Sequence, residues 1–373
     1  MNIFFNSIIN LIKYLRTNDE KKEFVFYSES KFYRDHFIDL IDNLIKLNQR
    51  NIIFVTSDID DYNFFNKKIN CIFIGNYFIL QIFFKILKCK FMIMTLTDLG
   101  NHLQKSKSCQ KYIYFFHALA STHEIYTNTA FKNYDIILTN GDYQTQELIF
   151  AEKNFNFQKK EIVNMGYFFL DYVKRKSNLF LEEKDHILFA PSWNYDQKNI
   201  FNDFSIDIIK TLLLNSFQVT LRPHPEHFKR CKKKLNKIAE LFSKNLKFNL
   251  DTNNSNLESL EKAALIITDN SSIVLEFLLI FKRPIIYINY NKKIHNINRS
   301  KIPIQTFEEV FKNKFGNITD VPSIKTLSAL CFNLIADKKN LEIEIDKFNL
   351  LNLSNYGNSS EMAAEYLLKK KNL

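Results

Sequence analysis

Short apolar runs alternate with longer, helix-spaced segments along most of the chain. The runs are rich in β-branched and aromatic residues, a pattern typical of buried strands. The segments between them repeat apolar positions every three or four residues, which favours amphipathic helices. Alternation of this kind predicts β-α-β units and parallel sheets.

The predicted strands form two sets. The first set comprises Phe24–Tyr27, Asn51–Thr56, Cys71–Ile74, Phe91–Leu96, Tyr112–Phe116, Asp135–Thr139 and Ile162–Met165. The second comprises His186–Ala190, Phe217–Leu221, Leu265–Thr268, Pro284–Ile288 and a weaker strand near Leu246–Leu250. The charged stretch Lys174–Asp185 between the sets is the best linker candidate. We therefore predict an α/β protein of two Rossmann-like, doubly wound parallel-sheet domains facing across a cleft.

The length of 373 residues agrees with two domains, since about 150 residues per domain is usual. We place an N-terminal domain at residues 1–178 and a C-terminal domain at residues 179–355. Residues 356–373 predict a C-terminal helix that crosses back to the N-terminal domain. Ser359 or Ser360 is its expected N-cap, with Glu361 in the first turn.

Two apolar stretches are candidates for membrane contact. Residues 1–16 lack the basic start and cleavage site of a signal peptide, and they predict an amphipathic helix. That helix packs on its own domain or, with Lys13 and Arg16, lies on a membrane surface. Tyr77–Leu96 carries three lysines, which a membrane span tolerates badly, so it predicts a helix followed by a strand.

Glycine is scarce, and its spacing excludes several familiar loops. The chain has 6 glycines, and no two lie closer than 25 positions. This excludes a G-x-x-x-x-G-K-[ST] phosphate loop, a G-x-G-x-x-G dinucleotide fingerprint and a G-x-S-x-G nucleophile elbow. Any phosphate must be bound by other means.

Charge and cysteine content narrow the partners. The net charge of +11 suits an anionic partner, or it reflects the lysine-rich codon usage of an A+T-biased genome. No RNA-binding aromatic signature or zinc-finger spacing is present, so we do not expect nucleic acid as a partner. The 5 cysteines are scattered without a C-x-x-C pair, which predicts reduced, buried thiols in a cytoplasmic protein.

The first candidate site is the segment Arg222-Pro223-His224-Pro225-Glu226, directly after a predicted strand. The prolines hold the loop out of the sheet, so Arg222 and His224 are expected to project from its carboxyl edge. A guanidinium beside an imidazole is a suitable anion-binding pair. The alternative is a proline-stiffened turn whose histidine caps a neighbouring carbonyl.

The second candidate is the junction of a predicted strand and helix at Asn270, Ser271 and Ser272. Free N–H groups and two hydroxyls at a helix N-terminus form a phosphate site that needs no glycine. A plain N-cap is the alternative. Glu276, one turn later, accepts a hydrogen bond from a substrate hydroxyl or faces solvent.

Further candidates follow two other strands. His117 comes after Tyr112–Phe116, and a neutral histidine is a suitable general base toward an alcohol, although a structural histidine also fits. Ser192 lies in Ala190-Pro191-Ser192-Trp193, whose tryptophan either stacks on a base or packs between domains. We expect no metal at the site, and we interpret Asp58-Ile59-Asp60 as a turn.

Taken in order, these motifs resemble one known family. APSW, RPHP and TDNSSIVLEF followed by KRPIIYI are similar to the C-terminal domain of the CDP-glycerol glycerophosphotransferase family. FFHALASTHEIY, YDIIL and Asn164-Met165-Gly166-Tyr167 resemble its N-terminal domain. The resemblance spans about Tyr112 to Asn289. The sequence departs from it at His117-Ala118-Leu119, where the family has His-Gly-Thr, and at Gly166-Tyr-Phe-Phe169, where it has Gly-x-Pro-Arg.

The resemblance implies a GT-B architecture and transfer of glycerol phosphate from CDP-glycerol to a hydroxyl of a polysaccharide or lipid-linked acceptor, releasing CMP. No cofactor beyond the donor is implied. We expect a cytoplasmic protein, with residues 1–16 as the candidate contact with the cytoplasmic face of the inner membrane. His117 matches the family's base, and His224 with Arg222 matches the element near the donor phosphates. Ser271 and Ser272 match the hydroxyls on the diphosphate.

Within the same resemblance, Glu276 stands where the family often has Asp. Three alternatives stay open. A GT-B sugar transferase for capsule or lipopolysaccharide shares the anion-binding helix end. A sugar-nucleotide 2-epimerase is less favoured, because its Ser-Gly-Gly turn is absent at Asn270–Ser272. A non-catalytic basic scaffold bound to membrane or polymer is the third.

Overall fold

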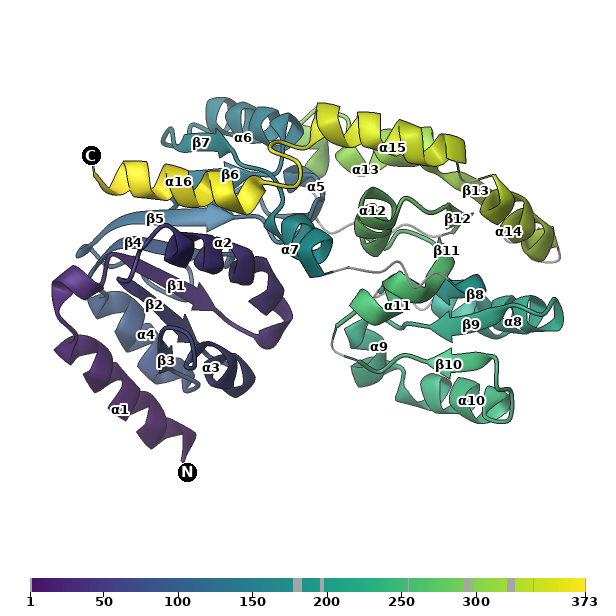
Figure 1. Ribbon diagram of the computed structural model, residues 1–373, viewed down its shortest axis with the longest axis horizontal. Coiled ribbons are helices and arrows are strands. Elements are labelled where there is room, and N and C mark those ends of the chain that lie inside the picture. Colours follow the sequence, from purple (N-terminus) through teal and green to yellow (C-terminus); the bar gives the residue numbers. More distant parts are fainter. Residues whose placement is uncertain are drawn as a thin grey trace. The chain divides into compact units, whose positions relative to one another are not determined.

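The computed structural model describes residues 2–176, 183–194, 198–253, 255–290, 296, 298–320, 326–337 and 339–372 (Figure 1). The chain divides into two compact units. Unit 1 contains Met1–Lys176, Asn298–Ile304 and Leu351–Leu373, and unit 2 contains Ser177–Ile297 and Gln305–Leu350. The domain boundary predicted at 178/179 lies outside the described residues. Two segments after that boundary, Asn298–Ile304 and Leu351–Leu373, belong to unit 1.

Unit 1 is built on a seven-stranded parallel sheet of order β3-β2-β1-β4-β5-β6-β7. Its strands are β1 Phe24–Ser28, β2 Ile52–Thr56, β3 Asn70–Phe73, β4 Cys89–Met94, β5 Cys109–Phe115, β6 Ile136–Thr139 and β7 Glu161–Asn164. Its helices are α1 Ile3–Arg16, α2 Arg34–Lys46, α3 Ile59–Phe65, α4 Tyr77–Ile86, α5 Thr122–Ile125, α6 Asp142–Asn154, α7 Phe168–Lys176 and α16 Ser359–Lys371.

Unit 2 contains a six-stranded parallel sheet of order β10-β9-β8-β11-β12-β13. Its strands are β8 Glu183–Phe189, β9 Gln218–Leu221, β10 Phe248–Leu250, β11 Ala263–Thr268, β12 Ile285–Asn289 and β13 Asn317–Asp320. Its helices are α8 Ile200–Leu214, α9 Pro225–Arg230, α10 Lys232–Phe242, α11 Leu257–Lys262, α12 Ile273–Glu276, the π-helix η3 Phe277–Phe281, α13 Phe307–Phe315, α14 Leu327–Ala336 and α15 Lys339–Asn352.

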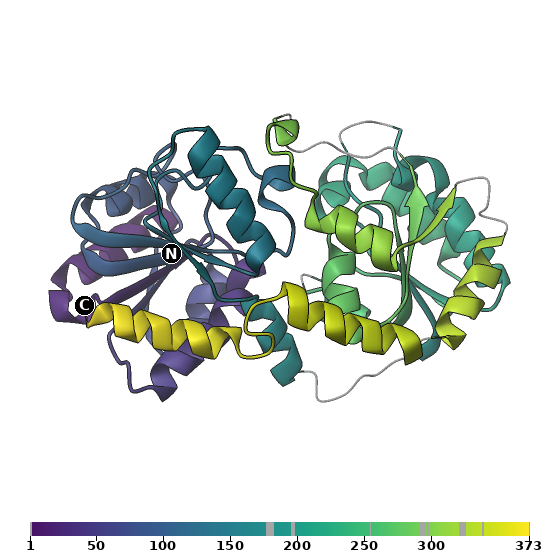
Figure 2. The ribbon, with the colours of Figure 1, turned by 90° about the horizontal axis from the view of Figure 1, so that it is seen from above.

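Helices cover both faces of each sheet, which explains why central strands such as β1, β2 and β11 are apolar without a break (Figure 2). In β1 every residue is buried. Val25 and Tyr27 join a core with Leu11 and Phe83 from α1 and α4. Their neighbours on the strand point to the other face, into a core that α2 and α16 complete. Every strand predicted from the sequence is present in the structure, and so are the helix and the strand predicted within Tyr77–Leu96.

Helix α1 buries one side only. Ser7, Leu11 and Tyr14 face the unit, and the Tyr14 hydroxyl donates to the carbonyl of Lys88 at 2.8 Å. The exposed apolar side chains of this helix are Ile3, Phe4, Phe5, Ile9, Ile12 and Leu15. No helix in the described part of the chain has both the length and the apolar character to span a bilayer.

The C-terminal helix α16 packs against α2 and α7 of unit 1 (Figures 1 and 2). The backbone N–H and hydroxyl of Ser360 donate to Asp171 at 2.7 and 2.9 Å, and the Ser359 hydroxyl donates to the same carboxylate at 3.4 Å. Burial raises the pKa of Asp171 to about 6. The prediction of Ser359 or Ser360 as N-cap was wrong: Asn358 occupies that position, because both serines turn toward Asp171.

Gly166 is required where the tail segment crosses the end of β7. Its φ is +95°, and a Cβ atom there would lie 2.1 Å from the backbone oxygen of Ser354. Gly357 has a similar φ of +84°, but its Cβ would meet first the flexible end of Lys174.

We expect Gly166→Ala to destabilise the protein more than Gly357→Ala does. Both variants incur the cost of a left-handed alanine, about 1 kcal/mol. Gly166→Ala additionally forces the backbone at Ser354 to move, which costs about 1–3 kcal/mol more. Urea unfolding of both variants measures the difference, and equal costs would contradict the packing described for the tail segment.

Candidate active site

The predicted site residues all follow the carboxyl ends of strands. His117 follows β5 in unit 1. In unit 2, Ser192 follows β8, Arg222 and His224 follow β9, and Asn270–Ser272 follow β11. Because β9, β8 and β11 are neighbours in one parallel sheet, the structure brings these unit 2 loops to a single edge.

A buried carboxylate ties two of these loops together. Asp269, 1% exposed, accepts from the backbone N–H of Ser192 at 2.8 Å and from its hydroxyl at 2.7 Å. The Thr268 hydroxyl donates to the carbonyl of Ala190 at 2.6 Å. The Ser192 hydroxyl therefore presents lone pairs, not its proton, to a ligand. Sequence reasoning missed Asp269, although it lies directly before Asn270.

Arg222 is held inside unit 2. Its guanidinium forms an ion pair with Asp251 and donates to the carbonyl of Ser255 at 3.1 Å. Asp251 is itself buried and also accepts from Ser259. We expected Arg222 to project beside His224 and to bind an anion with it. In the structure, part of its guanidinium is already bound to the carboxylate of Asp251.

His224 is the N-cap of α9. Its Nδ1 accepts from the backbone N–H of Glu226 at 3.2 Å. It therefore caps an N–H group, whereas the structural alternative in the sequence had it capping a carbonyl. Since Nδ1 is an acceptor, a neutral ring carries its proton on Nε2. His224 is exposed and presents this Nε2–H donor on the carboxyl edge of unit 2.

His227 supports His224 from below, and sequence reasoning missed it. Its Nδ1 accepts from the backbone N–H of His224 at 3.2 Å, which completes a capping box. Its ring stacks on Phe201 with centroids 4.0 Å apart and meets Trp193 edge-on at 5.1 Å. Burial, with a smaller effect of His224, lowers the pKa of His227 to about 3. The only signal in the sequence was a second histidine three residues after His224.

The segment Asn270–Ser272 opens a helix without a side-chain cap. Ser272 is the N-cap of α12, and its hydroxyl makes no capping hydrogen bond. The N–H of Ser271 donates to the Thr268 hydroxyl at 3.3 Å. The plain N-cap considered from the sequence is therefore not what the structure contains, and the exposed Ser272 hydroxyl remains at the helix start.

Glu276 ends α12 and is half-buried where the α-helix passes into the π-helix η3. π-Helical turns are rare and occur frequently at functional sites. Lys282 closes this turn in a left-handed conformation with φ 55°.

His117 lies among aromatic rings. Its ring centroid is 4.8 Å from that of Tyr33 and 6.1 Å from that of His36. Burial lowers the pKa of His117 to about 4, and it lowers that of His36 to about 3. His117 is thus neutral near pH 7, the state that a general base requires. The amide of Asn140 fixes the following loop by donating to the carbonyl of Ala118 at 2.7 Å.

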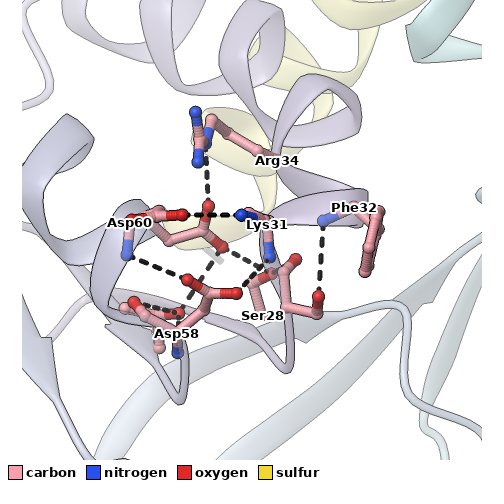
Figure 3. Close-up of polar contacts among 9 residues, drawn as sticks. Ser28, Lys31, Phe32, Arg34, Asp58 and Asp60 are labelled. Carbon is pink, nitrogen blue, oxygen red and sulfur yellow. Dashed lines mark hydrogen bonds and ion pairs between the residues drawn. The ribbon is translucent and has the colours of Figure 1, made fainter. Parts of the chain in front are cut away.

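The Asp58-Ile59-Asp60 element forms the start of a helix (Figure 3). Asp58 caps α3 by accepting from the N–H of Asp60 at 2.9 Å, and it also accepts from the N–H of Lys31 at 3.1 Å. Asp60 pairs with Lys31 at 2.7 Å, and Asp61 pairs with Arg34 at 2.8 Å. Within the described ranges, no group of three or more His, Cys, Asp or Glu is arranged to hold a metal ion.

The fold and these loops define an α/β protein of the GT-B class, with two doubly wound parallel-sheet units. The chain belongs to the CDP-glycerol:poly(glycerophosphate) glycerophosphotransferase family, whose model matches residues 9–318. A search of the curated proteins finds no matching relative.

Solved structures show the same fold. The wall teichoic acid polymerase TagF matches with a TM-score of 0.64 and 17% identity, over 98% of this chain and 94% of that chain. A TagF variant soaked with CDPG matches with a TM-score of 0.62 and 15% identity, over 98% and 93%. The UDP-GlcNAc 2-epimerase from Methanocaldococcus jannaschii matches with a TM-score of 0.56 and 14% identity, over 93% and 99%.

The buried, neutral state of His227 makes the protein less stable in acid. Its pKa lies below the unfolded value, so its contribution is present above about pH 6.5 and is lost as the pH falls toward 3. Between pH 7 and pH 5 the loss is about 2 kcal/mol. We expect His227→Gln, which cannot titrate, to reduce the pH dependence of the unfolding free energy by that amount.

Urea unfolding at pH 7 and pH 5 measures this effect. His102→Gln, a change at an exposed histidine, serves as the control and retains the wild-type slope. A slope unchanged in His227→Gln would show that His227 does not stay neutral in the folded protein.

Proposed function

We propose that this protein transfers a glycerol-phosphate group from CDP-glycerol to a hydroxyl of a cell-surface polysaccharide or lipid-linked acceptor, releasing CMP. The family match over residues 9–318 carries the proposal. The geometry of unit 2 supports it, since donors from His224 and from the start of α12 lie at one sheet edge where an anionic donor is expected to bind.

In the proposed reaction, the acceptor oxygen attacks the glycerol-bearing phosphorus. A new P–O bond forms, the P–O bond to CMP breaks, and the acceptor proton passes to His117. The neutral state of His117 suits it to take that proton. CMP leaves with the bonding electron pair, and its developing negative charge is stabilised by the Nε2–H of His224 and the hydroxyls of Ser271 and Ser272.

The remaining residues act as positioning groups in this proposal. Arg222, paired with Asp251 and bonded to the carbonyl of Ser255, holds the start of the loop that carries His224. The Ser192 hydroxyl donates its proton to Asp269, so its oxygen accepts a hydrogen bond from CDP-glycerol. Asn270 and Glu276 bind hydroxyl groups of the substrate, and no metal or cofactor takes part.

The roles of the two histidines are tested by His117→Gln and His224→Ala. We expect each to lower CMP release from CDP-glycerol by about 10²–10³-fold, because each removes one proton acceptor or one charge-directed donor. Glu226→Gln is the matched control, since it changes the residue beside the His224 cap while keeping the capping backbone N–H. Near-normal release by both histidine variants would refute the assignment.

The donor is tested by a panel of CDP-alditols and nucleotide sugars, with the released nucleotide as the readout. A GT-B sugar transferase is the second candidate, since the fold is shared with an enzyme of UDP-GlcNAc. CMP from CDP-glycerol supports the first function, and UDP from a UDP-sugar supports the second. If no donor in the panel releases its nucleotide, the remaining candidate is the non-catalytic scaffold bound to membrane or polymer, for which histidine substitutions leave that binding unchanged.

We also propose that α1 holds the protein on the cytoplasmic face of the inner membrane. Phe5, Ile9 and Ile12 form an exposed apolar stripe, flanked by Lys13 and Arg16. An apolar face with basic residues at its border suits an anionic bilayer surface.

We expect simultaneous replacement of Phe5, Ile9 and Ile12 by serine to lower binding to phosphatidylglycerol vesicles at least tenfold, because these apolar side chains no longer enter the bilayer. Vesicle co-sedimentation measures the change. The matched control replaces three leucines of unit 2, Leu214, Leu241 and Leu246, with serine; they are exposed by 56–103%, against 43–60% for the α1 residues. Equal losses in both triple variants would contradict a specific role for α1.

A further inference from the structure

A pocket of about 360 Å³ lies at the carboxyl edge of the unit 1 sheet. The loops that follow β1, β2, β3 and β4 form it through Glu29, Ser57, Gly75 and the segment Leu96–Asp98. This volume is at the lower end of the range for small-molecule pockets, so it suits one ring and not a polymer.

Tyr27, Ser57, Glu29 and Asp98 supply this pocket with hydrogen-bond acceptors, and Tyr77, Thr97 and His102 also line it. The Ser57 hydroxyl donates to the carbonyl of Ile74 at 2.9 Å, so the Tyr27 hydroxyl, 3.1 Å away, must donate to Ser57. Both oxygens then offer only lone pairs to a ligand. Asp98 accepts from Thr127 at 3.2 Å through one oxygen, and Glu29 has no ion pair within the described part of the chain.

This arrangement selects the chemical class of the ligand. Two carboxylates and one histidine, His102, line the pocket, and no lysine or arginine is among its described lining residues, so the pocket disfavours a phosphate group. The same carboxylates accept short, charge-assisted hydrogen bonds from hydroxyl donors. Tyr77, 54% exposed, supplies a ring face at the rim. A neutral ligand with several hydroxyls satisfies both requirements.

The pocket lies on the same sheet edge as His117. The segment Leu96–Asp98 follows β4, and His117 follows β5, the strand paired with β4. Tyr33, four residues after Glu29, contacts the His117 ring. A ligand bound in the pocket therefore lies at the same edge of the sheet as His117, the proposed base.

The rim of the pocket is held in place by the network in Figure 3. The Ser28 hydroxyl lies 3.0 Å from the carbonyl oxygen of Ser30 and 3.2 Å from a carboxylate oxygen of Asp61, and its single proton is donated to one of these two acceptors. The Lys31 N–H donates to Asp58. These bonds fix both ends of the turn that carries Glu29, so its carboxylate stays at the rim without a large ordering cost on binding.

We propose that this pocket binds an uncharged, polyhydroxylated group, a sugar ring or a polyol, as the terminal unit of the acceptor. Its assignment to the acceptor rests on the proposed function, whereas its preference for a neutral ligand does not. An acceptor ending in a phosphate is excluded by the two carboxylates, so transfer starts on a neutral hydroxyl-bearing terminus.

Ligand-observed NMR on the full chain, without donor, tests the preference. The probes are methyl α-D-glucopyranoside, methyl α-D-galactopyranoside and ribitol as neutral ligands, sn-glycerol 3-phosphate as the anion, and ethanolamine as the cation. We expect at least one neutral probe to bind and the anion to bind at least tenfold more weakly. In the double variant Glu29→Gln, Asp98→Asn, this discrimination falls at least tenfold.

Asp142→Asn is the matched control, since it removes an exposed carboxylate at the same sheet edge, after β6, that does not line the pocket. It is expected to keep the wild-type preference. The proposal is overturned if no neutral probe binds, if sn-glycerol 3-phosphate or ethanolamine binds more tightly than every neutral probe, or if the double variant keeps the wild-type discrimination. The wild-type comparison stands even if the double variant does not fold.

The two proposals can fail separately. If a neutral probe binds through Glu29 and Asp98 but no donor releases CMP, the proposed pocket stands and the proposed transferase activity is refuted. CMP release from CDP-glycerol without binding of any neutral probe removes the pocket alone.

Discussion

The parallel pairing of strands in each sheet is the constraint on which the rest of the structure depends. In a parallel sheet every strand ends at the same edge, so each strand-to-helix loop delivers its side chains there. In unit 2 this collects the loops of β8, β9 and β11, and Asp269 locks two of them by bonding Ser192. In unit 1 it collects His117 and the pocket bordered by Glu29.

The strands and the site loops were predictable because they depend on local pattern. Continuous apolar runs indicated every strand buried on both faces, whereas the polar edge strand Asn317–Asp320 was missed because it buries little. The loops after β5, β9 and β11 were identified from residue types alone. Their partners were not, because Asp251 lies 29 positions from Arg222, and such a pairing leaves no trace in local sequence.

His227 and His117 are both buried and neutral, and this state matters for the stability of the fold and for the proposed reaction. His227 is kept neutral by Phe201 and Trp193, and in that state it accepts the backbone N–H of His224. The tautomer of the exposed His224 ring is set by the backbone N–H of Glu226, which donates to its Nδ1. His117 is kept neutral in a similar way beside Tyr33. The site contains few glycines. Its polar groups come instead from the helix starts at His224 and Ser272 and from neutral histidine rings. Among the residues that the structure describes, three of the six non-glycine residues with positive φ are asparagines, which take turn positions that glycine usually fills.

Helix α16 has a consequence for the order of folding. Ala363, Ala364 and Leu367 belong to the same core as Phe24 and Phe54 of β1 and β2, yet all of unit 2 lies between them in the chain. The ribosome must therefore synthesise unit 2 before the core of unit 1 can close. Until then, unit 1 exposes the apolar surface of α2 that α16 later covers, and this intermediate is the stage at which a nascent chain is most prone to aggregate or to require a chaperone.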